Sequence, residues 1–497
     1  MRGKELVLKK AISLMLALLL LSSCSSRQPE NPEDRTEELQ PTEAKDAPAL
    51  PETETENPLD SLPTVDYGGA DYKMLCDTSA SWWKTSFYSE GLTGEIINDT
   101  VHARNQFAES RYNVTISYEG TESAAGMLHK DIAAGAGDYS VMWELLNRTL
   151  TPAQMGELLN LNDIPTLDMT GRGWDADSVS ALSINGKLYY VCNDINIHTM
   201  EGCSAAFFAK DQVVNNQLEN PYDLVRESRW TLDSMWKMME TVSGDTNGSG
   251  ERDEGDTFGL VTGVGSYMFL LNGAGGHLVI RETGNDGNDT FRMIVGTEEI
   301  INISEKVCSM LRDGNRTVLV NYDAWGNDAF NNGQALFKIM FIGDLSGMRD
   351  KMESDFGVLP LPMLNENQER YVCTVESTSH CMSVPATVPA SDTERIGVIT
   401  EALALYSDLY LVDAYYNTTL KGKIARDEDT TEMLDILVNN RTFEYSILYQ
   451  NWGVWGSYLP YVEKNGSEDL ASMAQSIQKV FDRSVQKTIE AYAENGR

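Results

Sequence analysis

The chain has 497 residues, of which 41% are hydrophobic, and carries a formal net charge of −36 at pH 7. A surface this acidic repels nucleic-acid phosphates and anionic lipid headgroups, which argues against a nucleic-acid partner. About 430 residues follow the two N-terminal segments described next, too many for one small core and enough for two lobes.

The first 24 residues have the three parts of a bacterial lipoprotein signal peptide. A basic start, MRGKELVLKK, precedes an apolar run of eleven residues at 11–21, and LSSC at 21–24 closes the segment. A permanent membrane-spanning helix needs about 20 apolar residues, so the run suits a signal peptide instead. Because LSSC resembles a lipobox, we expect acylation of Cys24 and anchoring to the extracytoplasmic face of the cell membrane. An ordinary secretory signal with a chance cysteine is the alternative.

Residues 25–65 are expected to form a disordered tether. Residues 25–63 hold eleven Asp and Glu against three Lys and Arg, and seven of the fifteen prolines of the chain. Such a segment buries too little apolar surface to offset the entropy lost on ordering. Proline and like-charge repulsion then keep it extended.

Short apolar runs alternate with helical patterns after the tether. Strands are predicted at 72–79, 114–120 and 139–143, and helices at 96–112 and 121–137. This alternation is typical of an α/β layer with a mostly parallel sheet. Ligands of such sheets lie beyond the carboxyl ends of the strands, where we place Trp82, Trp83 and Trp143.

Several segments further along the chain occur in an order that resembles a known family. They include LNLNDIP, INGKLYY, FFAK, NPYDLV, WTLDSM, FGL and DFGVLPLP, spread over roughly residues 66–450. The order is similar to that in the extracellular solute-binding lipoproteins of bacterial ABC importers, in the family 1 type with carbohydrate-binding members.

The resemblance implies an α/β fold of the two-lobed, periplasmic-binding-protein-like type II class, with a hinge between the lobes. The chain is expected to cross between the lobes near Val191–His198, Glu369–Thr374 and Leu411–Lys421. The N-terminal lobe would comprise residues 66–193 and 372–412. The C-terminal lobe would comprise residues 198–370 and 415–497.

DTNGSGERDEGD at 245–256 is close to a twelve-residue calcium loop. Its expected oxygen ligands are Asp245, Asn247, Ser249, Glu251, Asp253 and Asp256. Thr231 marks the start of a helix before the loop, and TFGLVTG after it reads as a strand, so a structural Ca²⁺ is favoured over a calcium sensor. Serine at position 5, Arg252 at position 8 and the short Asp256 at position 12 each weaken the match. A solvated acidic turn is the alternative.

Nothing in the sequence indicates catalysis. GxSxG, HExxH, a Walker loop and a complete GxGxxG are all missing, and the five histidines show no metal-ligand spacing. Acidic pairs suited to glycoside hydrolysis carry no weight in a chain with 75 Asp and Glu. The six cysteines other than Cys24 contain no CxxC pair, so their redox state is left open. We expect no enzyme and no organic cofactor.

Sugar recognition combines aromatic planes with carboxylates and amides in a concave site. The residues proposed to contact a ligand are Trp82, Trp83, Trp143, Glu144, Asp194, Tyr267, Asp344, Glu376 and Trp452. Core packing is the alternative for each of them. Trp174, Trp230 and Trp236 are assigned to packing, because they fall inside the shared segments.

Together these features predict a membrane-anchored extracellular substrate-binding protein, which captures a carbohydrate, in particular an oligosaccharide. The protein would deliver this sugar to the permease subunits of an ABC transporter, and we expect a monomer. A surface lipoprotein that hydrolyses glycans, or a receptor of the same fold for peptides or another solute, remains the alternative.

Overall fold

The computed structural model describes residues 57–80, 87–320, 324–352, 354–424 and 427–495. The predicted signal peptide with Cys24, most of the tether, Trp82 and Trp83 lie outside the described residues. In the part of the chain that is described, no helix combines the length and apolar character that crossing a membrane requires.

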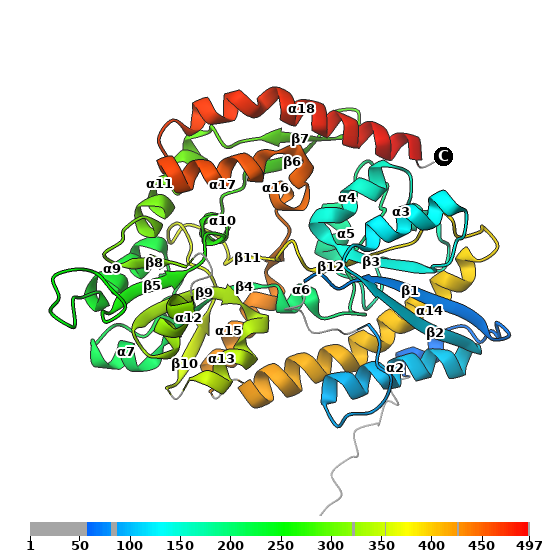
Figure 1. Cartoon of the computed structure of the whole chain (residues 1–497), viewed down its shortest axis with the longest axis horizontal. Coiled ribbons are helices and arrows are strands. Elements are labelled where there is room, and N and C mark those ends of the chain that lie inside the picture. The colour runs from blue at the N-terminus through cyan, green and yellow to red at the C-terminus, as the bar shows by residue number, and fades with distance from the viewer. Residues whose placement is uncertain (1–56, 81–86, 321–323, 353, 425–426, 496–497) are drawn as a thin grey trace, which may run out of the picture. The chain divides into compact units, whose positions relative to one another are not determined.

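Two separate sheets organise the described chain (Figure 1). The first sheet has the order β12-β3-β1-β2, with β1 (Ala70–Asp77) parallel to both β2 (Val114–Thr121) and β3 (Val141–Leu145). Strand β12 (His380–Ser383) joins antiparallel to β3 and comes from far along the chain. The helices of this lobe are α2 (Ile96–Tyr112), α3 (Ala124–Ala134), α4 (Leu146–Gln154) and α5 (Ala176–Leu182).

The second sheet has the order β10-β4-β9-β5-β8. Strands β5 (Phe258–Thr262), β8 (Thr317–Leu319) and β9 (Ala335–Phe341) run parallel, so their carboxyl ends share one edge. Strands β4 (Ser204–Ala209) and β10 (Phe356–Leu359) complete the sheet through antiparallel pairing. The helices of this lobe are α7 (Lys210–Asn215), α8 (Pro221–Arg226), α9 (Leu232–Val242), α10 (Ser266–Gly273), α11 (Glu298–Leu311), α12 (Ala324–Asn331), α13 (Leu345–Lys351) and α15 (Glu428–Asn439).

The remaining elements are two small strand pairs, short helices and the C-terminal helices. The strand pairs are β6 (Val279–Thr283) with β7 (Asp289–Met293), and β11 (Cys373–Thr374) with β13 (Arg441–Thr442). The short helices are η1 (Pro58–Ser61), η2 (Leu161–Asp163), η3 (Ile342–Asp344), α6 (His198–Glu201) and η6 (Gln450–Trp452). The C-terminal helices are α16 (Tyr445–Leu448), α17 (Val454–Asn465) and α18 (Leu470–Asn495).

Three chain segments connect the two sheets. The first runs from Cys192 through α6 to β4, and the second covers residues 375–379 between β11 and β12, directly after the expected Glu369–Thr374. The third is helix α14 (Thr393–Tyr406), which continues as the π-helical segments η4 (Ser407–Leu411) and η5 (Asp413–Ile424). These three connections form the region between the lobes in which a hinge can lie.

Local sequence explains how α9 begins and which face it buries. The Thr231 hydroxyl accepts a hydrogen bond from the Ser234 amide, and the Ser234 hydroxyl accepts one from the Thr231 amide, which makes a capping box. The apolar residues recur at helical spacing and are all buried, namely Leu232, Met235, Met238, Met239 and Val242.

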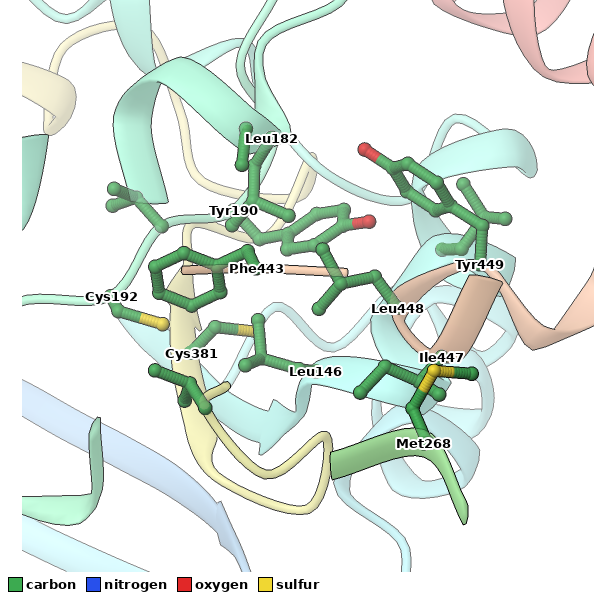
Figure 2. Packing of buried hydrophobic residues seen from close by; sticks show 14 of the residues in the cluster. Leu146, Leu182, Tyr190, Cys192, Met268, Cys381, Phe443, Ile447, Leu448 and Tyr449 are labelled. Carbon is green, nitrogen blue, oxygen red and sulfur yellow. The ribbon is translucent and has the colours of Figure 1, made fainter. Parts of the chain in front are cut away.

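One hydrophobic core continues from the first lobe into the C-terminal segments (Figure 2). Leu146, Leu182 and Tyr190 of the first lobe lie close to Phe443 and Leu448, and all of these side chains are buried. Cys192 and Cys381 belong to the same core, and the six described cysteines are all free and buried. The lobes therefore share apolar packing as well as connecting chain.

Helix α18 contacts the first lobe as well as the second. Asn495 donates to the carbonyl of Ala153 at 2.9 Å, Gln154 donates to the Thr488 hydroxyl at 2.8 Å, and Tyr189 donates to the Tyr492 carbonyl at 3.0 Å. The same helix packs against β7 and α17. It thus ties α4 to the C-terminal region.

Candidate functional site

A cavity of about 270 Å³ lies at the carboxyl ends of the parallel strands of the second sheet. Its lining begins directly after β5 with the loop Gly263–Gly265 and continues with Ser266 and Phe269 of α10. Val320 directly after β8, the end of β9, Asp344 in η3 and Glu376 in the second connection complete it. The cavity is therefore built by one sheet edge and one connecting segment, as expected for ligand sites of α/β sheets.

The first lobe meets the second beside this cavity. Phe341, which lines the cavity, packs against Ala80 after β1 and Leu145 at the end of β3. Phe341 also contacts Phe269 edge to face, with 5.3 Å between the ring centroids. Both lobes thus present the carboxyl ends of their strands to the same place.

Two carboxyl groups, Asp344 and Glu376, are the ionisable side chains that line the cavity. Burial raises the pKa of Glu376, although the amide of Thr378 and the hydroxyl of Ser377 each donate to its Oε1 at 3.3 Å. Burial also raises the pKa of Asp344, whose Oδ2 accepts a hydrogen bond from the amide of Phe341 at 3.2 Å. An acidic lining of this kind suits a ligand that donates hydrogen bonds and carries no negative charge.

Two polar residues of the first lobe, Asn147 and Arg148, lie near the cavity and were not predicted from the sequence. Asn147, at the start of α4, donates from its backbone amide to the Ser377 carbonyl at 3.0 Å, next to Glu376. The Asn147 side-chain oxygen is buried and has no hydrogen-bond partner within the described ranges. Arg148 lies 3.3 Å from Asp77 at the end of β1 and donates to Ser79 at 2.9 Å. Their position shortly after β3 was the signal that could have identified them.

Trp143 and Glu144 are core residues of β3. Trp143 is fully buried, and its ring centroid lies 4.9 Å from that of Phe87. The Glu144 carboxylate accepts hydrogen bonds from the amides of Ala125 and Leu145, each at 2.8 Å. Burial raises the pKa of Glu144 to about 7. Neither side chain lines the cavity, because β3 extends to Leu145 and Trp143 is at its centre.

Two further predicted ligand residues lie in the core instead of at the cavity. Tyr267 is fully buried, and neighbours Leu311 and Arg312 beside a different surface depression. Trp452 is buried against Phe291, at 4.8 Å between ring centroids, and donates from Nε1 to the Thr488 hydroxyl at 2.9 Å. Their large apolar surfaces stabilise packing and are not open to a ligand in this structure.

Asp194 lies in the first connection, among buried charges. Burial raises its pKa to about 7, whereas attraction to Arg441 acts to lower it. Arg441 is paired with Asp175 at 3.1 Å. Of the nine predicted ligand residues, the structure thus brings Asp344 and Glu376 together at the cavity and places Asp194 in the hinge.

A histidine pair joins α6 of the first connection to the start of β12. The Nδ1 atoms of His198 and His380 lie 2.8 Å apart, and His380 Nε2 lies 2.8 Å from the Asp77 carbonyl oxygen. Because a carbonyl only accepts, Nε2 carries the proton and His380 Nδ1 accepts from His198. Burial lowers the pKa of His380 to about 4. His380 is therefore neutral near pH 7.

The acidic loop at 245–256 lies between α9 and β5 and is closed by two backbone hydrogen bonds between Gly244 and Thr257. The Asp245 carboxylate accepts from the amides of Gly248, Ser249 and Gly250 at 2.7 to 3.2 Å. These bonds bend the loop around its first residue.

Some of the expected ligand atoms of this loop gather. The Ser249 hydroxyl lies 3.0 Å from the Glu251 carbonyl oxygen and 3.2 Å from Asp253 Oδ2, and Asn247 donates to Asp253 at 2.8 Å. Asp256 is buried and lies 3.2 Å from the Arg252 guanidinium. Burial acts to raise the pKa of Asp256, but backbone amides and Arg252 lower it below its usual value.

The donor chemistry of positions 3 to 9 thus fits Ca²⁺, whereas Arg252 already neutralises position 12. Across the described residues, no group of three His, Cys, Asp or Glu side chains is arranged to hold a metal ion.

No family model and no curated protein matches the sequence. Solved structures do match. Maltose-bound MalE3 of T. maritima shares 16% identity at a TM-score of 0.52, covering 83% of this chain and 100% of that chain. UgpB of Mycobacterium tuberculosis, in complex with glycerophosphocholine, shares 13% identity at a TM-score of 0.53, covering 85% of this chain and 99% of that chain.

An ABC transporter solute-binding protein of Thermotoga lettingae bound with α-D-tagatose shares 11% identity at a TM-score of 0.51, covering 84% of this chain and 100% of that chain. Identities this low establish the fold and leave the ligand open. The resemblance read from the sequence is confirmed at the level of the fold: the chain has the two-lobed fold of the solute-binding proteins of ABC importers.

Proposed function

We propose that the protein is a substrate-binding protein that captures a carbohydrate between its lobes and delivers it to the permease of an ABC transporter. The observation that carries the proposal is the cavity in which Asp344 and Phe341 of one lobe meet Glu376 of the hinge. A ligand in this cavity contacts one lobe and a connecting segment at the same time, so its binding can favour the closed arrangement of the lobes.

Carbohydrate is favoured by the chemistry of the lining. Phe269 and Phe341 offer apolar ring surface, and Asp344 and Glu376 offer acceptors for hydroxyl groups. The lining side chains include no Lys or Arg among the residues described, so an anionic ligand would meet two acids and no counter-charge. Maltose in MalE3 and tagatose in the Thermotoga protein are neutral sugars, which supports the same class here.

Two alternatives use the same fold. UgpB in complex with glycerophosphocholine shows that a neighbour can bind a solute that is not a sugar. A hydrolase would need two carboxyl groups on either side of a scissile bond, and Asp344 with Glu376 is the pair that the cavity offers. No motif in the sequence favours hydrolysis.

A thermal-shift screen tests the ligand class. We expect neutral oligosaccharides to raise the melting temperature and peptides and sugar phosphates to leave it unchanged. A ligand at 100 times its Kd stabilises the folded state by about 2.7 kcal/mol. Chromatography of each sugar after incubation should show no product. A shift with peptides alone, or release of shorter sugars, would overturn the proposal in favour of the corresponding alternative.

Membrane anchoring through Cys24 and docking on permease subunits belong to the same proposal. The lipobox-like LSSC supports the anchor, because two or more acyl chains hold a protein stably on a membrane. Mass spectrometry of the mature protein checks this. An acylated cysteine as the first residue is expected, and an unmodified residue 24 within the chain would contradict it.

We also propose a structural Ca²⁺ in the loop 245–256. Removing calcium with a chelator should lower the melting temperature and leave sugar affinity unchanged, because the loop and the cavity share no residue. Asp253→Ala should abolish the calcium effect, whereas Asp286→Ala, an exposed carboxylate in the β6–β7 turn, should preserve it. A melting temperature that stays unchanged when the chelator is added would contradict the calcium proposal.

A further inference from the structure

A second concave site lies on the C-terminal lobe, between α9, α11 and the loop that follows β10. Its volume is about 640 Å³, more than twice the 270 Å³ of the cavity beside Glu376. The two cavities share no lining residue. The proposed capture of a sugar between the lobes leaves this groove unexplained.

The floor of the groove is apolar and includes Trp236, which was predicted from the sequence to be a packing residue. Leu232 and Met310 are buried beneath it, and Trp236 is half-buried. The Arg316 guanidinium lies over the Trp236 ring at 5.0 Å from its centroid. Arg316 is itself paired with Asp313 and, at 3.2 Å, with Glu240. The indole is thus fixed before any ligand arrives, which lowers the entropic cost of binding.

The rim of the groove carries polar side chains at helical spacing. Asn302, Glu305 and Ser309 are exposed on one face of α11 and extend over about 10 Å of helix. Among the described residues, none of these three side chains has a hydrogen-bond partner. Lys306 crosses to Asp233 of α9 at 2.7 and 2.8 Å, which orients its ammonium group. Asn365 lies on the third wall.

We propose that this groove is a second carbohydrate site, which holds a short segment of a neutral glycan chain outside the space between the lobes. The fixed indole supplies a flat apolar surface for a sugar ring. The separate amide, carboxylate and hydroxyl groups on the rim suit hydroxyls that point in different directions. A peptide that binds as a strand or as a helix uses an open strand edge or a continuous apolar groove, and the rim of separate polar groups provides neither.

Affinity electrophoresis of the full chain tests this site. Native gels would contain a starch-type α-glucan, a mixed-linkage β-glucan or a xylan, and Trp236→Ala, Asn302→Ala and the parent chain would be run together. We expect at least one polysaccharide to retard the parent chain. Trp236→Ala should raise the apparent Kd for it about tenfold or more, and Asn302→Ala by a smaller factor.

Two controls keep the result specific. Trp455→Ala removes another half-buried tryptophan, on α17, that does not line the groove, and should leave the retardation unchanged. Glu376→Ala should also leave it unchanged while weakening small-sugar binding between the lobes, so that failure of one site can be told from failure of the other. Equal retardation of parent and Trp236→Ala, with both folded, or no retardation of the parent by any of the three polysaccharides, would overturn the proposal.

Discussion

Single side chains determine which ligand the cavity can bind, and the substitution Glu376→Ala tests this dependence most directly. The Glu376 carboxyl group comes from the hinge, lines the cavity and accepts long hydrogen bonds of 3.3 Å from the Ser377 hydroxyl and the Thr378 amide of its own loop. We expect Glu376→Ala to weaken sugar binding by roughly 10- to 100-fold, because a hydrogen bond to a charged group contributes about 1.5–3 kcal/mol. Calorimetric titration of both proteins measures the ratio.

Glu369→Ala is the matched control, since Glu369 is an exposed carboxylate seven residues earlier and lines no part of the cavity. Equal affinities for the parent chain and Glu376→Ala would place the ligand elsewhere.

The lowered pKa of His380 predicts how the stability of the protein depends on pH. Burial depresses its pKa to about 4, so the unfolded chain, with an ordinary value near 6.5, binds the proton more readily. The contribution of His380 to stability is therefore complete above about pH 6.5 and is lost as pH falls towards 4. The full effect amounts to about 3 kcal/mol.

Unfolding of the parent chain and His380→Gln between pH 4 and 7 isolates this effect. Asp194 and Glu144 titrate in the same range with raised pKa values and contribute the opposite slope, so only the difference between the two proteins is informative. We expect the stability advantage of the parent chain to shrink as the solution is acidified. An advantage that stays constant or grows would show that His380 is not held neutral.

At the scale of elements, helix α18 is expected to contribute much of the stability of the region where the C-terminal helices pack on the first lobe. Phe481 is 1% exposed and packs edge to face on Trp452, at 5.9 Å between ring centroids. Phe481→Ala should lower the free energy of unfolding by about 3–5 kcal/mol, because it leaves a cavity in a core that relaxes only partly. Urea unfolding measures the change.

The neighbouring residue supplies the control for α18. Val480 is 59% exposed on the same helix, so Val480→Ala should change the free energy of unfolding by no more than about 0.5 kcal/mol. Similar losses for Val480→Ala and Phe481→Ala would indicate that α18 frays and does not tie the lobes together.

Elements were predictable where local patterns are strong. The predicted helix at 96–112 coincides with α2, and Thr231 begins the helix that the sequence indicated. The third predicted strand differs by two residues from β3, and that small shift moves Trp143 from a strand end into the core. Strand ends are set by pairing with β1 and β12, which are distant in the sequence, so periodicity alone could not locate them.

The residues of the candidate site were likewise predictable only where a local sequence pattern marks them. Asp344 and Glu376 line the cavity, and each comes after a strand or connection that the sequence marked. Tyr267 and Trp452 are buried in the core. In a sequence, an aromatic residue beside glycine or serine looks the same whether it faces a ligand or a helix. Asn147 and Arg148 were missed because only the fold brings α4 beside the Glu376 loop.

At the scale of the whole molecule, the carboxyl end of the second sheet forms the cavity, and Ala80 and Leu145 at the strand ends of the first sheet pack beside it on Phe341. A shared core, three connections and α18 hold the two lobes together. Such an arrangement suits reversible capture of a ligand. The sequence indicated two lobes through the order of its segments, whereas the tie made by α18 depends on contacts between residues more than 300 positions apart, such as Gln154 and Thr488.

The most direct test of the central claim is calorimetric titration of the full chain with the neutral oligosaccharide that stabilises it most, followed by chromatography of the cell contents. The account predicts heat from binding that Glu376→Ala reduces, and recovery of the sugar unchanged. Shorter products in the cell, or no heat from any sugar with the protein folded, would contradict it.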